Sequence, residues 1–193
     1  LKLFYAKELV PINSNSFDIF KNIKMEIKEE KIVLLDIDFN HPELIAASGN
    51  PDKKKITKHY YYLNKLINNL SVMYKKKIVI CIHPLDNLEN KKKYFPNLNV
   101  VQYESRENIY KAFLVLFFNT SAIIDAILLK KRILCLISNF ASENITNMGL
   151  DFVNRAGLLK INIEEEIKVN KGRFLSKLDD AKDNYSNYIK SYI

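Results

Sequence analysis

Short, uninterrupted apolar runs recur along the chain, and each one stops at polar residues. Three of them lie in KIVLLDID from Lys31, KIVICI from Lys77 and FLVLFF from Phe113. A strand with one face in water alternates apolar and polar residues, whereas a strand covered on both faces of a parallel sheet is apolar throughout. Amphipathic segments separate the runs, such as the helix predicted from Ile56 to Tyr74. The pattern therefore predicts an α/β protein built on a parallel sheet.

The remaining runs bring the predicted sheet to about six strands. They are NVVQY, RILCLI and the short LLKINI, and shorter helices are predicted from about Arg106 to Ala112 and from about Ser121 to Lys130. Because connections between parallel strands are right-handed, a doubly wound, Rossmann-like fold is the economical arrangement. The segment NHPELIAASGNPDK, between the first strand and the long helix, is predicted to be a loop.

The chain is long enough for one well-buried domain. It has 193 residues, of which 48% are hydrophobic and 27% charged, as in ordinary soluble proteins. It has no apolar run long enough for a membrane span. Because it starts at Leu1 rather than Met, we expect either a fragment of a longer protein or a processed chain. The predicted parts are an N-terminal segment over residues 1–30 with a helix from Phe17 to Glu30, the Rossmann-like domain over residues 31–170, and a closing helix over residues 171–193.

The net charge of +8 does not by itself predict a nucleic-acid-binding protein. Lysine supplies 26 of the 30 basic residues, and arginine, the usual reader of phosphates and bases, occurs four times. Three lysine clusters are spread along the chain and are interpreted as solvated surface: Lys53–Lys55, Lys75–Lys77 and Lys91–Lys93. An acidic partner, a nucleotide or an anionic membrane surface stays open as an alternative.

Both cysteines, Cys81 and Cys135, lie inside apolar strand-like runs and are predicted to be free, buried thiols. Neither cysteine lies in a CxxC motif or at the spacing of metal ligands, so no zinc site is expected. The sequence has four glycines in all and lacks GxGxxG, GxxxxGK(S/T) and GxSxG. Dinucleotide-dependent dehydrogenases, P-loop enzymes and hydrolases with a serine elbow are therefore disfavoured.

Polar residues follow the predicted strands at their carboxyl ends, where open parallel sheets bind ligands. In chain order they are Asp36 and Asp38 with His41 beyond, His83-Pro84, Tyr103-Glu104-Ser105, Asn119-Thr120-Ser121, and Ser138-Asn139. Since these strand ends meet at one edge of the sheet, we predict that this edge binds a ligand. His59, near the start of the long helix, is expected on the surface.

Asn119, Thr120 and Ser121 interrupt an apolar stretch where a strand gives way to a helix. A hydroxyl at this point caps a helix by accepting a backbone N–H, and free N–H groups at a helix start also attract phosphate. The two interpretations are compatible. With His83 on a neighbouring strand end, the pattern favours a phosphate held by hydroxyls, N–H groups and a histidine, as in nucleotide-sugar transferases.

The segments IVICIHP and FFNTSAIIDAILLKKRILCL, about thirty residues apart, resemble the C-terminal, donor-nucleotide-binding half of GT-B glycosyltransferases. The similarity is to enzymes of bacterial capsule and lipopolysaccharide synthesis, a group that includes Kdo transferases and GT-B sialyltransferases. These families carry an HP motif and then a pair of Ser or Thr residues at a helix start, which match His83-Pro84 and Thr120-Ser121. VLLDIDFNHP and YESRENIYKAF are similar to further parts of that domain, so the resemblance spans roughly residues 30–170.

The resemblance implies a nucleotide-sugar donor, with CMP favoured, and a glycan or lipid-linked glycan acceptor. It implies that His83 contacts the donor phosphate and stabilises the charge that develops as CMP leaves. The other implied nucleotide- or phosphate-binding residues are Pro84, Glu104, Ser105, Asn119, Thr120, Ser121 and Asp125. Asp38 is a candidate general base. A solvent-facing Asp125, and a Ser105 that caps the next helix with Asn108, stay open as alternatives.

The resemblance is incomplete. The acidic pair followed by Gly that supplies the catalytic base of sialyltransferases has no clear copy, because Asp36-Ile37-Asp38 lacks the Gly. About thirty residues cannot form an acceptor domain, so the chain looks like a donor half whose acceptor half is missing or separate. Two alternatives stay open: a CDP-glycerol-type polyol-phosphate transferase and a non-catalytic, nucleotide-binding Rossmann-like module. A receiver domain is disfavoured because the third and fifth strands end without the matching Asp and Lys.

No cofactor is expected, and no metal, since a GT-B site typically stabilises the leaving group with protein groups. Asp36 and Asp38 alternate along a strand end and do not form a DxD motif in a loop that would hold a cation. No nucleic-acid partner is expected. The resemblance implies a cytoplasmic protein, with peripheral association with the inner face of the cytoplasmic membrane as a further option.

Overall fold

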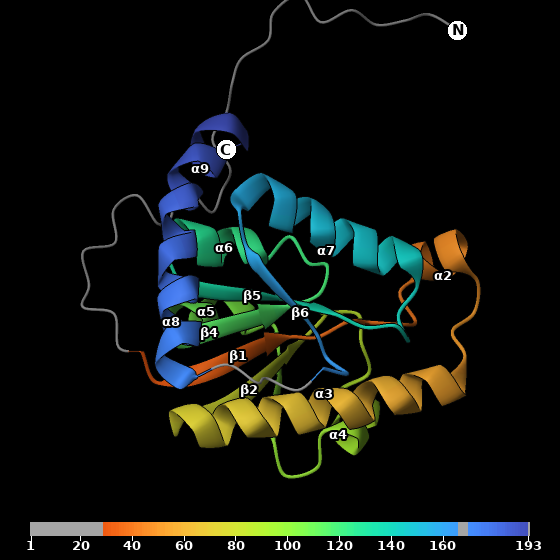
Figure 1. The fold of residues 1–193 in the computed structure, drawn as a ribbon. Helices are drawn as coiled ribbons and strands as arrows, with labels where there is room; N and C mark the ends of the chain where they lie inside the picture. Colours follow the sequence, from red (N-terminus) through yellow and green to blue (C-terminus); the bar gives the residue numbers. More distant parts are fainter. Residues whose placement is uncertain (1–28, 166–169, 193) are drawn as a thin grey trace, which may run out of the picture.

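The computed structural model describes residues 29–165 and 170–192, which contain one six-stranded parallel sheet (Figure 1). Its strands are β1 (Lys31–Leu35), β2 (Lys77–Ile82), β3 (Asn99–Gln102), β4 (Ala112–Phe117), β5 (Arg132–Ile137) and β6 (Leu159–Asn162). They lie in the order β3-β2-β1-β4-β5-β6, which reverses between β1 and β4. This is the order of a doubly wound Rossmann-like sheet. The predicted fold class and the predicted strands are confirmed.

Helices cover both faces of the sheet (Figure 1). They are α2 (Pro42–Ser48), α3 (Lys53–Tyr74), α4 (Leu88–Tyr94), α5 (Ser105–Tyr110), α6 (Ile123–Leu128), α7 (Glu143–Ala156), α8 (Lys171–Asp180), the 3-10 helix η1 (Ala181–Asn184) and α9 (Tyr185–Tyr192). Helices α3 and α8 pack on one face, and α5, α6, α7 and α9 pack on the other. The predicted closing helix is therefore divided into three elements. The helix predicted from Phe17 lies almost entirely outside the described residues.

The continuous apolar runs arise because each central strand is buried on both faces. In β1, Ile32 and Leu34 pack with the α3 side of the core, and Val33 and Leu35 pack with the α6 side. Each fully buried side chain of this size contributes about 1.5–3 kcal/mol to folding. Both cysteines are free and buried in the sheet, as predicted.

Three helices, α2, α4 and α7, lie where the sequence pattern above predicts none. The predicted loop after β1 contains α2, which has Pro42 at its first position and ends at Gly49, where φ is 76°. Helix α7 follows Ser142, whose hydroxyl accepts the N–H of Ile145, and ends at Gly157, where φ is 63°. A proline at the start of a helix and a glycine after its end are recognised local signals, so α2 and α7 could have been predicted from the sequence.

Helix α6 begins at Ile123, two residues later than predicted, because Thr120 and Ser121 form the turn that precedes it. It is only six residues long. The strand-to-helix junction therefore presents Thr120 and Ser121 as turn residues rather than as part of a long helix.

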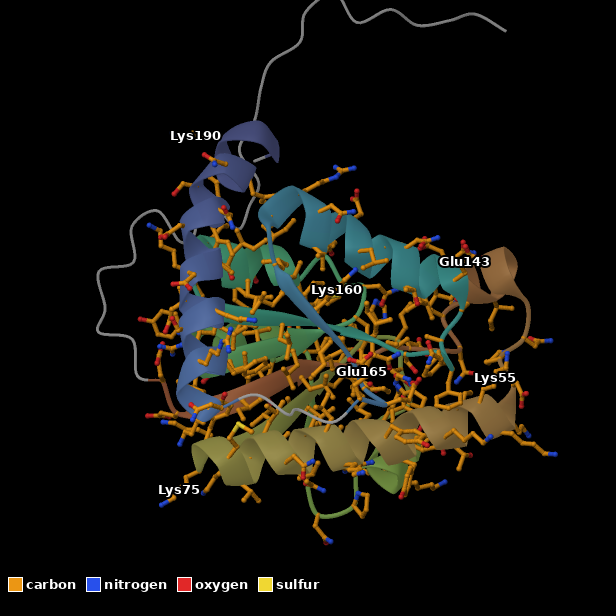
Figure 2. All side chains as sticks on the ribbon, viewed as in Figure 1. Lys55, Lys75, Glu143, Lys160, Glu165 and Lys190 are labelled. Carbon is orange, nitrogen blue, oxygen red and sulfur yellow. The ribbon has the colours of Figure 1, made fainter. Side chains whose placement is uncertain are left out.

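The lysine clusters are mostly solvated, as expected. Figure 2 shows Lys55 on α3, Lys75 directly after α3 and Lys190 on α9 at the periphery of the molecule. Lys91 is the exception, since it is only 4% exposed. The surface interpretation is wrong for this residue because its ammonium is paired with carboxylates inside the protein.

Candidate functional site

A pocket of about 340 Å³ opens at the carboxyl edge of the sheet, at the switch point between β1 and β4. Its walls are formed by the segments that follow β1, β2 and β4, together with residues of α2, α5 and α7. The polar lining residues are Asp36, Asp38, His41, Glu43, His83, Ser105, Asn119, Thr120 and Ser121. The structure thus brings together most of the polar groups that follow the strands in the sequence.

His83 stands at the end of β2 with its ring fixed by a local bond. Its Nδ1 lies 3.2 Å from the N–H of Leu85, which donates to it. A neutral ring that accepts at Nδ1 carries its proton on Nε2, so Nε2 is left as a donor. The side-chain amide of Gln102 donates to the carbonyl of Pro84 at 2.8 Å, and the hydroxyl of Tyr103 donates to the same oxygen at 3.0 Å. The end of β3 therefore holds the His83-Pro84 loop in place.

Thr120 and Ser121 also line the pocket, from the turn after β4. The Thr120 Oγ1 accepts the N–H of Ala122 at 3.3 Å, which is a local turn bond, and its own O–H stays available to donate. The first helical residue, Ile123, follows a position with no side-chain cap. In the described part of the chain the Ser121 hydroxyl makes no side-chain hydrogen bond and is exposed. Asn119 makes one weak contact, with its Nδ2 4.0 Å from the sulfur of Met148.

Asp125 and Glu104 do not line this pocket. Asp125 is buried, and its Oδ2 accepts the Nε–H of Arg106 at 3.1 Å, so it joins α6 to α5 and does not face solvent. Glu104 precedes α5 without a side-chain cap bond, and its carbonyl accepts from the side-chain amide of Asn108 at 2.9 Å. Ser105 is the first helical residue and lines the pocket, so the alternative in which it caps α5 is wrong.

The two acids after β1 have different surroundings. The Asp36 Oδ2 lies 2.6 Å from the ammonium of Lys91 and accepts the hydroxyl of Tyr60 at 3.0 Å. The negative charge of Asp36 is therefore balanced by the ammonium of Lys91 inside the protein. Asp38 is also buried and lines the pocket, and its Oδ1 accepts the N–H of Asn40 at 2.9 Å. Of the two, Asp38 is the carboxylate without a cationic partner in the described residues.

His59 is completely buried, which contradicts the surface position expected from the sequence. Its Nδ1 lies 3.0 Å from Oγ of Ser138, and its ring packs against Phe39 with centroids 4.9 Å apart. Burial, with a smaller contribution from the charge of Lys91, lowers the pKa of His59 to about 3. A helical period places His59 on the same face as Leu63, four residues later, and this signal predicts its burial.

Among residues 29–165 and 170–192, no group of three or more His, Cys, Asp or Glu side chains is placed to hold a metal ion. No helix in the same ranges has the length and apolar character needed to cross a membrane.

No model of a protein family and no curated protein sequence matches the chain. Among solved structures it is similar to the UDP-GlcNAc 2-epimerase of Methanocaldococcus jannaschii in complex with UDP-GlcNAc and UDP, with 18% identity, a TM-score of 0.42 and coverage of 91% of this chain and 42% of the other. It is similar to the spinosyn rhamnosyltransferase SpnG, with 11% identity, a TM-score of 0.48 and coverage of 86% and 43%. A third similar structure is a mutant of S. aureus TarM in complex with fondaparinux, α-GlcNAc-glycerol and UDP, with 13% identity, a TM-score of 0.37 and coverage of 93% and 38%. The chain spans less than half the length of each of these three proteins.

Proposed function

We propose that this chain is the donor-binding half of a GT-B glycosyltransferase, which takes a sugar from a nucleotide-sugar and passes it to a glycan acceptor. The observation that carries the proposal is the placement of His83, with Nε2 left as a donor, in the same pocket as the hydroxyls of Thr120 and Ser121. The pocket volume of about 340 Å³ is at the lower end of the range for small-molecule sites, about 300–1,000 Å³.

The proposed chemistry is charge stabilisation at the leaving phosphate. The Nε2–H of His83 donates to a phosphate oxygen, and this bond strengthens as the nucleotide leaves and negative charge accumulates there. Thr120 accepts the N–H of Ala122 while its O–H donates to the ligand, and Ser121 donates from the same turn. Asn119 completes this side of the pocket.

The hydroxyl of Ser105 is proposed to contact the ribose or base, and the ring of Pro84 to pack against the nucleotide. Asp38 is the candidate general base, because it lines the pocket and Asp36 is already paired with Lys91. The resemblance of the HP and Thr-Ser motifs supports a CMP-linked donor and an acceptor on a bacterial surface glycan. Action at the inner face of the cytoplasmic membrane belongs to the same proposal.

Calorimetric titration with CMP, CDP, UDP and GDP tests the proposal. We expect selective binding of CMP, weakened at least tenfold in His83→Asn, whose Oδ1 retains an acceptor for the N–H of Leu85 but which lacks the Nε2 donor. Ser121→Ala is expected to weaken binding by a smaller factor. The matched control is Thr57→Ala, which removes an exposed hydroxyl of α3 that donates to the carbonyl of Lys53 and lies outside the pocket.

Other outcomes separate the alternatives. Tighter binding of CDP, with competition by CDP-glycerol, would favour the polyol-phosphate transferase. Nucleotide binding without sugar transfer in the full-length protein would favour the non-catalytic module. Failure of all four nucleotides to bind would contradict the proposal.

A further inference from the structure

The rings of His41 and His83 contact each other, although the two residues are far apart in the sequence. His41 precedes α2, and His83 follows β2. Their ring centroids are 4.9 Å apart, with the ring planes at 84° to each other, in an edge-to-face contact. Both rings line the pocket. His41 is therefore as well placed for a ligand as His83 is.

Each of the two rings is held by a backbone N–H on its Nδ1 side. The N–H of Glu43 donates to Nδ1 of His41 at 3.4 Å, and the N–H of Leu85 donates to Nδ1 of His83 at 3.2 Å. Both neutral rings therefore carry their proton on Nε2, which makes Nε2 of each ring a donor. Two such donors on adjacent rings match the several acceptor oxygens of a phosphate group.

The charged residues around the pocket determine how many donors a bound anion would need. The described residues that line it include no lysine or arginine, so the side-chain donors available to an anion there are neutral groups, among them the Nε2–H of each histidine. Asp36 is compensated by Lys91, but Asp38 and Glu43 also line the pocket and oppose an anion. A phosphate group in this pocket would gain from Nε2–H donors on both rings, in addition to the hydroxyls of Thr120 and Ser121.

We infer that His41 is a second phosphate-binding residue, which acts with His83 as a pair of imidazole donors on one phosphate group of the ligand. This inference rests on the proposed function for the nucleotide attached to that phosphate. The pair itself requires only that the ligand carries a phosphate group.

Histidine-selective ¹⁵N labelling gives a direct test, because the chain has three histidines and the third, His59, is completely buried. The protein is titrated with inorganic phosphate and separately with CMP, and the ring nitrogen signals are followed. We expect saturable shifts of the Nε2 signals of His41 and His83, with His59 unchanged as the internal reference. A shift of His83 alone would overturn the inference.

The matched variants are His41→Asn and His83→Asn. Asparagine is a good N-cap residue, and its Oδ1 can accept the N–H of Glu43, so His41→Asn preserves the start of α2 while it removes the Nε2 donor. We expect each variant to weaken phosphate and CMP binding about tenfold. If His41 only caps α2, His41→Asn binds like the wild type, which would overturn the inference even if the variant at His83 loses binding.

The two proposals fail in different ways. If inorganic phosphate shifts both rings but no nucleotide binds, the proposed function is wrong and the histidine pair stands. If CMP binds and only His83→Asn weakens it, the pair is wrong and the proposed function stands. If neither inorganic phosphate nor any nucleotide binds, both are wrong.

Discussion

The ammonium of Lys91 lies 2.6 Å from Oδ2 of Asp36 and joins α4 to the end of β1 beside the pocket. The same ammonium lies 3.0 Å from Oδ2 of Asp86 and 2.5 Å from the hydroxyl of Tyr60. Burial alone lowers the pKa of Lys91, but the carboxylates of Asp36 and Asp86 outweigh it and hold the pKa above its ordinary value. Lys91 is therefore charged in the folded protein, and it positions the segment from which Asp38 and His41 reach the pocket.

Lys91→Met is expected to lower the free energy of unfolding by about 3–5 kcal/mol, because it leaves buried carboxylates without their cation. Urea denaturation at pH 7 measures the change. The control is Lys92→Met on the same helix, which removes an exposed ion pair with Glu89 and should leave stability nearly unchanged. Equal effects of the two variants would contradict the role given to Lys91.

His59 is expected to make the protein sensitive to mild acid. Its pKa is about 3 in the folded state and near 6.5 when the chain is unfolded, so below pH 6.5 the unfolded state binds the proton more readily. Stability from this group is complete above pH 6.5 and falls as the pH drops towards 3, with a loss of about 2 kcal/mol at pH 5. Urea denaturation at pH 7 and pH 5 measures this loss.

The control for this prediction is His59→Gln, which cannot titrate in this range. Whatever its stability at pH 7, the variant should lose about 2 kcal/mol less than the wild type between pH 7 and pH 5. An identical loss in both proteins would show that His59 does not stay neutral in the folded state.

Gly149 is expected to tolerate no side chain, although it lies in the interior of α7. A Cβ at this position would lie 2.1 Å from the backbone carbonyl oxygen of Phe118, which cannot rotate away. Gly149→Ala should therefore destabilise the protein by about 3 kcal/mol, against the helix propensity that favours alanine by about 1 kcal/mol. Thermal unfolding measures the effect. In the matched variant Gly172→Ala, the nearest atom is Oδ1 of Asn170 at 3.4 Å, and we expect unchanged or slightly higher stability.

The two thiols are expected to be unreactive in the native protein. Burial raises the pKa of Cys81 and of Cys135 to about 12, so very little thiolate exists at pH 8. A disulfide-exchange reagent such as DTNB should titrate both thiols in 8 M urea and neither within minutes without denaturant. Cys81 borders the pocket, so if one thiol reacts slowly we expect it to be Cys81, with protection by a bound nucleotide. Rapid reaction of Cys135 would contradict its burial in the sheet.

Much of the fold follows from local patterns in the chain. A strand buried on both faces must be apolar throughout, which is why runs such as residues 32–35 and 78–82 predict a parallel sheet without any knowledge of contacts. The carboxyl ends of parallel strands meet at one edge, so the position of His83 and of Thr120-Ser121 beside one pocket also follows from strand order. The caps of α2 and α7 were local signals of the same kind.

The chemistry around the pocket was decided by the tertiary structure. In the sequence, nothing distinguishes Lys91 from the solvated lysines next to it. Its side chain is buried because it pairs with Asp36, 55 residues earlier. His59 meets Ser138, 79 residues later, and His41 meets His83 only because their strand ends are adjacent in the sheet. The sequence by itself determined the strands, the helical periods and the edge where polar groups collect, since these depend on spacing along the chain. Partners, burial and charge compensation depend on distances between residues far apart in sequence, which only the folded chain sets.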